Sequence, residues 1–170
     1  MTDLHAQEQS VPITIPRRLD PEDAQYALQE LQSILRRQEV VDGMAQRQYD
    51  ADDRSHMLEG VLQRQHQAEI KTIVNQLHPA DIAFTLESLP VHGRQIVWHL
   101  VDTTHDADVL LEVDDWARES LIKSMDHQDL VNATGTMDAD EIADLAADLP
   151  AAVIAEVQKG LTEEERAQLI

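Results

Sequence analysis

An apolar residue recurs every twelve positions along the second half of the chain. These positions are Leu77, Leu89, Val101, Val113, Met125, Met137, Leu149 and Leu161. The next residue is usually a helix opener, most often aspartate or proline, and a His-Pro pair takes this place once. Twelve residues accommodate a helix of about eight or nine residues and a short turn. The pattern therefore predicts a series of short helices from residue 77 to residue 170.

The stretch 77–90 shows the repeated unit most completely. Proline suits the first helical turn, and a His-Pro pair opens this stretch. Ile82, Leu86 and Leu89 then share one helical face, and a second proline ends the unit. Residues 137–150 repeat the same arrangement sixty positions later without a gap. Helices this short are unstable alone, so we predict an all-α, solenoid-like stack in which neighbouring helices pack on one another.

One unit of the repeat departs from the others. Residues 132–136 read Asn-Ala-Thr-Gly-Thr, which combines a helix breaker with poor helix formers. We therefore expect the helix of the unit 125–136 to be short or frayed.

Residues 1–54 predict a separate N-terminal extension. Residues 1–19 lack a helical period, and we expect a disordered arm. Asp20 is a good cap for a helix that runs to about Val41 and ends at Asp42-Gly43. Residues 44–54 are poorly patterned and favour a loop or a weak helical turn. The apolar stripe of this first helix is Ala24, Leu28, Leu31 and Leu35.

A second long helix is predicted from about Ser55 into the repeat. Its stripe is Leu58, Val61, Leu62, Ile70, Ile73, Val74 and Leu77. One or two long helices would thus precede the stack of short ones.

Charge changes the picture more than any other bulk property. The formal net charge is −20, and residues 77–170 hold 20 acidic and 5 basic residues, a net of −15. Nucleic acid and anionic membrane surfaces would be repelled, whereas cations or a basic partner would be attracted. The absence of cysteine excludes disulfides and thiolate metal sites. No apolar run approaches the roughly 18–20 residues of a membrane span.

No pattern of catalytic residues is present in the sequence. No histidine pair at i, i+4 encloses an acid, so the zinc-protease pattern is absent, and we assign the eight histidines to surface or capping positions. The sequence also lacks a nucleophile elbow, a glycine-rich phosphate loop and a redox dithiol. We therefore expect that this chain is not an enzyme.

Carboxylates at helical spacing are the strongest candidates for ligand binding. Asp140, Asp144 and Asp148 are spaced by four, and Asp108 and Glu112 form a second such pair. Like charges at this spacing repel, which a protein tolerates on a solvated face or uses to hold a cation. Oxygen ligands suit Mg²⁺ or Ca²⁺. Spacing alone does not separate a metal site from an acidic surface.

Two segments resemble the cytosolic N-terminal domain of the MgtE family of magnesium transporters. They are Leu-His-Pro-Ala-Asp-Ile-Ala at residues 77–83 and Asp-Ala-Asp-Glu-Ile-Ala-Asp-Leu at residues 138–145, joined by the repeated Leu-Pro stops. The resemblance extends over about residues 55–170, so 55–170 is the expected domain and 1–54 an extension that does not map onto it. Family members continue into CBS domains and a transmembrane pore, which this chain does not contain, and we expect the chain to be an excised domain.

The resemblance implies a fold and a role. The fold is a right-handed superhelix of short helices. The role is to sense intracellular Mg²⁺ and gate the pore by docking on the CBS domains of the same transporter, a homodimer when full-length. The Mg²⁺ ligands of the family correspond to Asp108, Asp140 and Asp144. The full-length protein would place this domain at the cytoplasmic face of the inner membrane, and the excised domain would be soluble.

A helical-repeat scaffold without a metal role is the alternative. The flagellar motor switch protein FliG has related short-helix repeats, so a similar fold would also suit a domain that binds a protein partner. A basic partner would favour the scaffold, and a divalent-dependent change in stability would favour the sensor.

Overall fold

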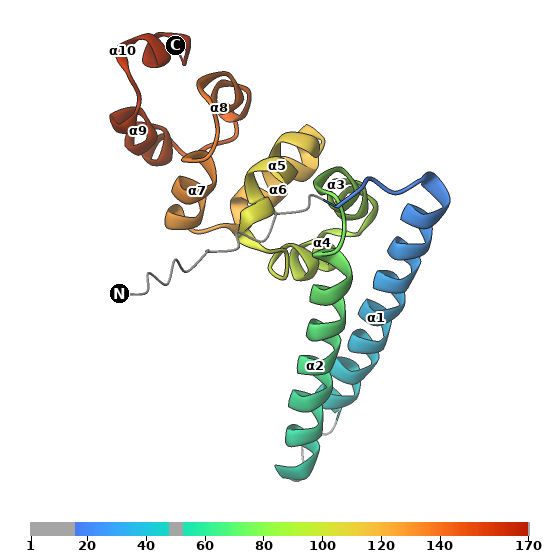
Figure 1. The fold of residues 1–170 in the computed structure, drawn as a ribbon. Coiled ribbons are helices and arrows are strands. Elements are labelled where there is room, and N and C mark those ends of the chain that lie inside the picture. Colours follow the sequence, from blue (N-terminus) through green and yellow to red (C-terminus); the bar gives the residue numbers. More distant parts are fainter. Residues whose placement is uncertain (1–15, 48–52, 170) are drawn as a thin grey trace, which may run out of the picture.

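The computed structural model describes residues 16–47 and 53–169, and every regular element among them is helical. Two long helices are followed by a stack of short ones (Figure 1). The elements are α1 Pro21–Arg47, α2 Asp53–Val74, α3 Pro79–Ser88, α4 Val91–Trp98, η1 Thr103–His105, α5 Asp106–Glu112, α6 Asp115–Ser124, α7 His127–Thr134, α8 Ala139–Leu145, α9 Ala151–Gly160 and α10 Glu163–Gln168. The all-α class is confirmed, and the right-handed superhelix stays a prediction.

The twelve-residue repeat sets where the short helices begin. Each predicted opener is the N-cap of a helix, and most of them accept a hydrogen bond from a backbone N–H of the first turn. Asp114 Oδ1 accepts from Ala117 N at 2.7 Å, and Asp126 Oδ1 accepts from Asp129 N at 2.8 Å. The recurring apolar residues lie at the turns with buried or half-buried side chains. Caps and anchors of the repeat were therefore readable from the sequence.

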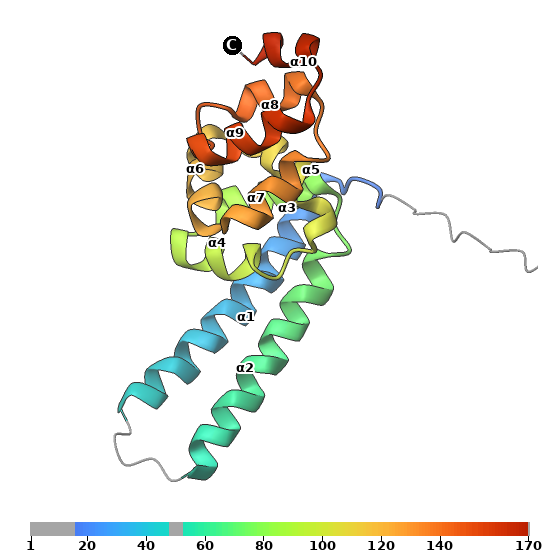
Figure 2. The same ribbon diagram turned by 90° about the vertical axis from the view of Figure 1, so that its left-hand side faces the viewer.

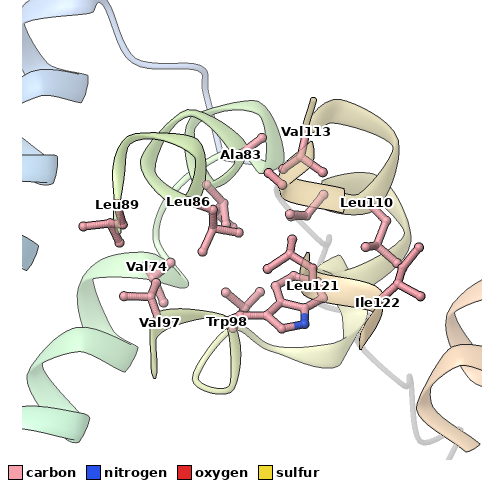
Figure 3. Packing of buried hydrophobic residues seen from close by; sticks show 14 of the residues in the cluster. Val74, Ala83, Leu86, Leu89, Val97, Trp98, Leu110, Val113, Leu121 and Ile122 are labelled. Atoms are coloured by element: carbon pink, nitrogen blue, oxygen red, sulfur yellow. The ribbon is translucent and has the colours of Figure 1, made fainter. Parts of the chain in front are cut away.

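Alternate short helices pack on one another. α3 packs on α5, α7 packs on α9, α4 packs on α6, and α8 packs on α10. The short helices are stacked at one end of the two long helices (Figure 2). Their shared core is aliphatic, and Leu86, Leu110 and Leu121 in its centre are fully buried (Figure 3). A chain with few aromatic residues buries its apolar surface in this way.

α7 is not the weak helix that its sequence indicates. It ends at Thr134, and Gly135 is its C-cap, so the breaker does end the helix. Its eight residues nevertheless equal the length of α4. The expectation of a shortened helix is therefore wrong, although its endpoint is where the glycine predicts.

The two long helices form an antiparallel hairpin that projects from the stack (Figures 1 and 2). α1 continues four residues beyond Gly43, so the predicted helix end at Asp42-Gly43 is wrong. Nothing lies within 4 Å of the position where a Cβ of Gly43 would be, and its φ is not positive. Glycine in a helical conformation lowers stability without ending the helix. Residues 1–15 of the arm expected at 1–19, and part of the loop expected at 44–54, lie outside the described residues. Residues 16–19 are described and are not helical, but Leu19 N donates to Asp81 Oδ2 at 2.8 Å, so this end of the expected arm contacts the stack.

Only the inner half of the hairpin is packed. Ile70 and Val74 of α2 are buried, whereas Leu58, Val61 and Leu62 of the same predicted stripe are exposed. The predicted apolar stripe of α2 is therefore present, but its outer part extends beyond the stack of short helices. The hairpin lies close against the stack at Gly93 of α4, where an added Cβ would lie 3.2 Å from Leu35 Cδ1.

Candidate functional site

α8 presents two of the three predicted ligands. Asp140 lies in its first turn and Asp144 one turn later, and both side chains are exposed. The helix is fixed by a capping box, in which Asp138 Oδ1 accepts from Glu141 N and Glu141 Oε2 accepts from Asp138 N, both at 2.9 Å. The side chains of Asp138 and Glu141 therefore cap the start of α8, while those of Asp140 and Asp144 face solvent.

Asp148 does not continue the acidic stripe. α8 ends at Leu145, so Asp148 lies in the turn after it. Its Oδ2 is 3.9 Å from Arg118 Nη1, and its side chain is mostly buried. The spacing of four is helical for Asp140 and Asp144 alone, and Asp148 serves the packing between α6 and the turn after α8.

Asp108, the third predicted ligand, lies in the first turn of α5 and is exposed. Glu112 follows on the same helix, as the spacing predicts, and is also exposed. α5 packs on α8, so the three aspartates come from two helices in contact. Among residues 16–47 and 53–169, however, no three acidic or histidine side chains are placed to hold a metal together. The three predicted ligands are exposed on two helices that contact each other, and they do not form a closed coordination shell.

One carboxylate that the sequence did not single out is chemically unusual. Asp106, the first residue of α5, is only 7% exposed. Burial, together with the negative charges of Asp129 and Asp102, raises the pKa of Asp106 to about 7. The burial of Asp106 could have been predicted from its position in the twelve-residue repeat, because the same position in the other units holds an apolar residue or an arginine.

The histidines of residues 16–47 and 53–169 follow the sequence prediction except at one position. His78 caps α3, its Nδ1 accepting from Ala80 N at 3.1 Å. His66 is instead buried in the hairpin, with Nδ1 2.6 Å from Gln38 Oε1, and Gln38 Nε2 donates to Asp42 Oδ1 at 2.7 Å. This network satisfies buried polar groups between α1 and α2. The prediction of a surface or capping role for His66 was therefore wrong.

The MgtE intracellular N domain family matches residues 77–170, more than half of the chain and all of the short-helix stack. The chain belongs to the MgtE intracellular N domain family. No curated protein and no solved structure matches it. This family is an intracellular regulatory domain of magnesium transporters and is not a known enzyme family. The match confirms the resemblance to the MgtE N-terminal domain, and no finding supports the FliG-like scaffold.

No helix in the described part of this MgtE domain is both long enough and apolar enough to cross a membrane. The longest, α1, has 27 residues but carries charges along its length.

Proposed function

We propose that this MgtE domain senses intracellular Mg²⁺ through Asp108, Asp140 and Asp144. The ion would favour docking of the domain on the CBS domains of the same transporter and so close the pore. The transporter would be a homodimer with this domain at the cytoplasmic face of the inner membrane. The observation that carries the proposal is the family match over the whole stack that contains these three aspartates.

The surroundings of the three aspartates support an ion held between domains. All three are exposed, and they lie on α5 and α8, which pack on each other. Mg²⁺ keeps several waters and takes one or two carboxylates from a protein. A partner domain that supplies further oxygen ligands would complete the shell, so an open half-site on this chain is what such an interface requires.

The electrostatics of the domain give the mechanism its direction. Residues 77–170 carry a net charge of −15, from 20 acidic and 5 basic residues. Bringing a partner carboxylate close to this surface costs Coulomb energy unless a cation lies between the two. Mg²⁺ shifts the docking equilibrium only by its preference for the docked state. Because the ligands come from two domains, each half alone should bind weakly.

Thermal unfolding tests the half-site on this chain. Mg²⁺ is raised from zero to about 20 mM and compared with NaCl of equal ionic strength. We expect a saturable rise in Tm that is reduced in the double variant Asp140→Ala/Asp144→Ala. Glu30→Ala/Glu39→Ala is the matched control, because both glutamates are exposed on α1. If the wild type and the site variant respond equally to Mg²⁺, and no more than to NaCl, the half-site is wrong.

A further inference from the structure

The fifth residue after each recurring apolar position is a core position of the repeat. In the eight units it is Ile82, Arg94, Asp106, Arg118, Leu130, Ile142, Ile154 and Arg166. Asp106 is the only acidic residue in this series and, like the central aliphatic members, is buried. A carboxylate at an aliphatic position loses its hydration and gains nothing from packing. Asp106 at this position therefore requires a binding partner other than the apolar side chains of the core.

The arginines in this series show what the position can do. Arg94 Nε donates to Leu86 O at 2.8 Å, and its Nη2 donates to Leu89 O at 3.2 Å. These carbonyls belong to the residues eight and five positions earlier, at the end of the preceding helix. Arg118 repeats both bonds, and Arg166 Nε donates to the carbonyl eight positions earlier at 2.8 Å. A guanidinium cation therefore neutralises the C-terminal end of the preceding helix in these units.

In the unit of Asp106 a cavity takes the place of that guanidinium. The residues eight and five positions before Asp106 are Trp98 and Val101, and both line a cavity of about 110 Å³ beside Asp106. The end of α4, which carries the negative end of its dipole, faces a carboxylate here instead of an arginine. The unit thus lacks the positive charge that its neighbours carry in their own side chains.

A second cavity, of about 280 Å³, lies between η1 and α7. Both cavities are bordered by Thr103, Asp106 and Asp129. The larger cavity is also bordered by Thr104, Asn132 and Thr136, whose side-chain oxygens are neutral and hydrogen-bond within the protein. Since a water molecule takes about 30 Å³ in the liquid, this space holds several waters around an ion.

No arginine or lysine among the described residues lines either cavity beside Asp106, and His99 is the one basic side chain that borders the smaller cavity. The side chain of Asp106 is 93% buried, and its carboxylate accepts no hydrogen bond from a described residue. Asp129 and Asp102 add negative charge near it. A buried carboxylate in this situation binds either a proton or a cation.

We propose that Asp106 and Asp129 bind a hydrated Mg²⁺ ion in the cavities between η1, α5 and α7, at a site distinct from Asp108, Asp140 and Asp144. Two carboxylates, neutral oxygens and retained water are the ligand set that Mg²⁺ takes in proteins. Two carboxylates are also fewer than a closed metal cluster requires, in agreement with the absence of such a cluster among residues 16–47 and 53–169. The ion replaces, from solution, the cation that arginine supplies in the neighbouring units.

Paramagnetic Mn²⁺ tests this site residue by residue in the isotope-labelled full chain. Mn²⁺ replaces Mg²⁺ at oxygen sites and broadens the amide signals of nearby residues. We expect saturable broadening at Thr103, Asp129 and Asn132, reversed by excess Mg²⁺. Loss of a group that merely orients a metal ligand already costs about tenfold in affinity or more. Asp106→Asn and Asp129→Asn should each weaken Mn²⁺ binding here by at least about as much.

Matched variants separate this site from the proposed interface site. Glu112→Gln removes an exposed carboxylate of α5 that borders neither cavity, and it should leave the broadening at Thr103 unchanged. Asp140→Asn/Asp144→Asn should remove broadening on α8 alone. Asp129 is exposed, so Asp129→Asn tests the site even if Asp106→Asn fails to fold. Broadening at Thr103 that is absent, that Mg²⁺ does not reverse, or that survives Asp129→Asn would overturn the proposal.

Discussion

At the scale of single residues, Asp106 couples the stability of the domain to pH. Its pKa is raised from 3.8 to about 7 by folding, so the folded state retains a proton that the unfolded state has lost. Stability therefore falls as the pH rises from about 4 to about 7 and stays low above that range. Each pKa unit corresponds to about 1.4 kcal/mol, so a rise of the pKa by about three units puts the loss at about 4 kcal/mol.

Asp106→Asn should remove this loss, because the amide cannot ionise. The free energy of unfolding is measured with urea at several pH values between 4 and 8, in a chelator to exclude divalent ions. We expect the variant to gain on the wild type as the pH rises and to be the more stable protein at pH 8. Asp115→Asn, an exposed site, is the control. Parallel pH profiles for Asp106→Asn and the wild type would show that this carboxyl is not desolvated in solution.

At the same scale, the sequence predicts which side chains are exposed better than it predicts which residues they contact. The helical spacing of Asp140 and Asp144 correctly places both on one face of α8. It fails for Asp148, because the end of α8 depends on how the following turn packs against Arg118. The burial of Asp106 was also within reach, since its repeat phase is that of Ile82 and Ile142. The cavities beside it depend on the length of neighbouring side chains, which a repeat pattern does not specify.

At the scale of elements, an arginine that binds the end of the preceding helix is a structural part of the repeat. Arg94 is 1% exposed, donates to two carbonyls of the preceding unit, and lies 4.8 Å from the ring centre of Trp116. The Nη1 atom of Arg94 is buried and has no hydrogen-bond partner among the described residues. The guanidinium therefore has more donors than the two carbonyls accept from. Lysine cannot make the two-pronged contact or stack on the indole in the same way.

Arg94→Lys should therefore destabilise the domain by about 2–3 kcal/mol, the cost of losing hydrogen bonds from a buried charged group. Arg166→Lys is the matched control at the same repeat position, where the side chain is exposed and makes a single bond to Gln158 O. Exposed substitutions of this kind change stability by about 0.5 kcal/mol or less. Urea unfolding of both variants measures the difference. Equal effects at the two positions would mean that burial of the guanidinium contributes nothing.

Helix starts and helix ends differ in how well the sequence predicts them. Starts follow local chemistry, because an N-cap such as Asp114 bonds to a backbone N–H three residues away. Ends follow tertiary contacts more closely. Gly43 does not stop α1, because its φ is not positive and a glycine in a helical conformation lowers stability without ending the helix. The stripe of α2 was visible as a pattern, but the pattern does not say that Leu58 and Leu62 lie beyond the reach of the stack.

At the scale of the whole molecule, charge and apolar exposure are unevenly distributed. The stack of short helices holds a net charge of −15 out of −20. Most of the exposed large apolar residues lie on the outer half of the hairpin, including Val40, Met44, Met57, Leu58 and Val61, although Phe84, Val91 and Trp116 are exposed on the stack. Self-repulsion of charge lowers the stability of a compact state and is screened by salt. The stack should therefore respond to ionic strength more than the hairpin does.

Charge reversal at two places tests where the repulsion lies. Asp140→Lys/Asp144→Lys and Glu30→Lys/Glu39→Lys both change the net charge from −20 to −16, the first on α8 and the second on α1. All four side chains are exposed, so we expect far-UV circular dichroism to be unchanged. The Tm of each protein is followed as NaCl rises from about 20 to 500 mM, over which the Debye length falls from about 20 to 4 Å.

We expect the wild type to gain stability with salt, and the α8 variant to gain less because its lysines already supply the cations that salt provides. The α1 variant should behave like the wild type, since residues 21–47 carry 5 acidic and 3 basic residues and repel one another little. An equal reduction in both variants would mean that the repulsion depends on total charge alone. A reduction confined to the α8 variant would show a local field at the surface shared by α5 and α8, where a divalent ion would have the largest effect on docking.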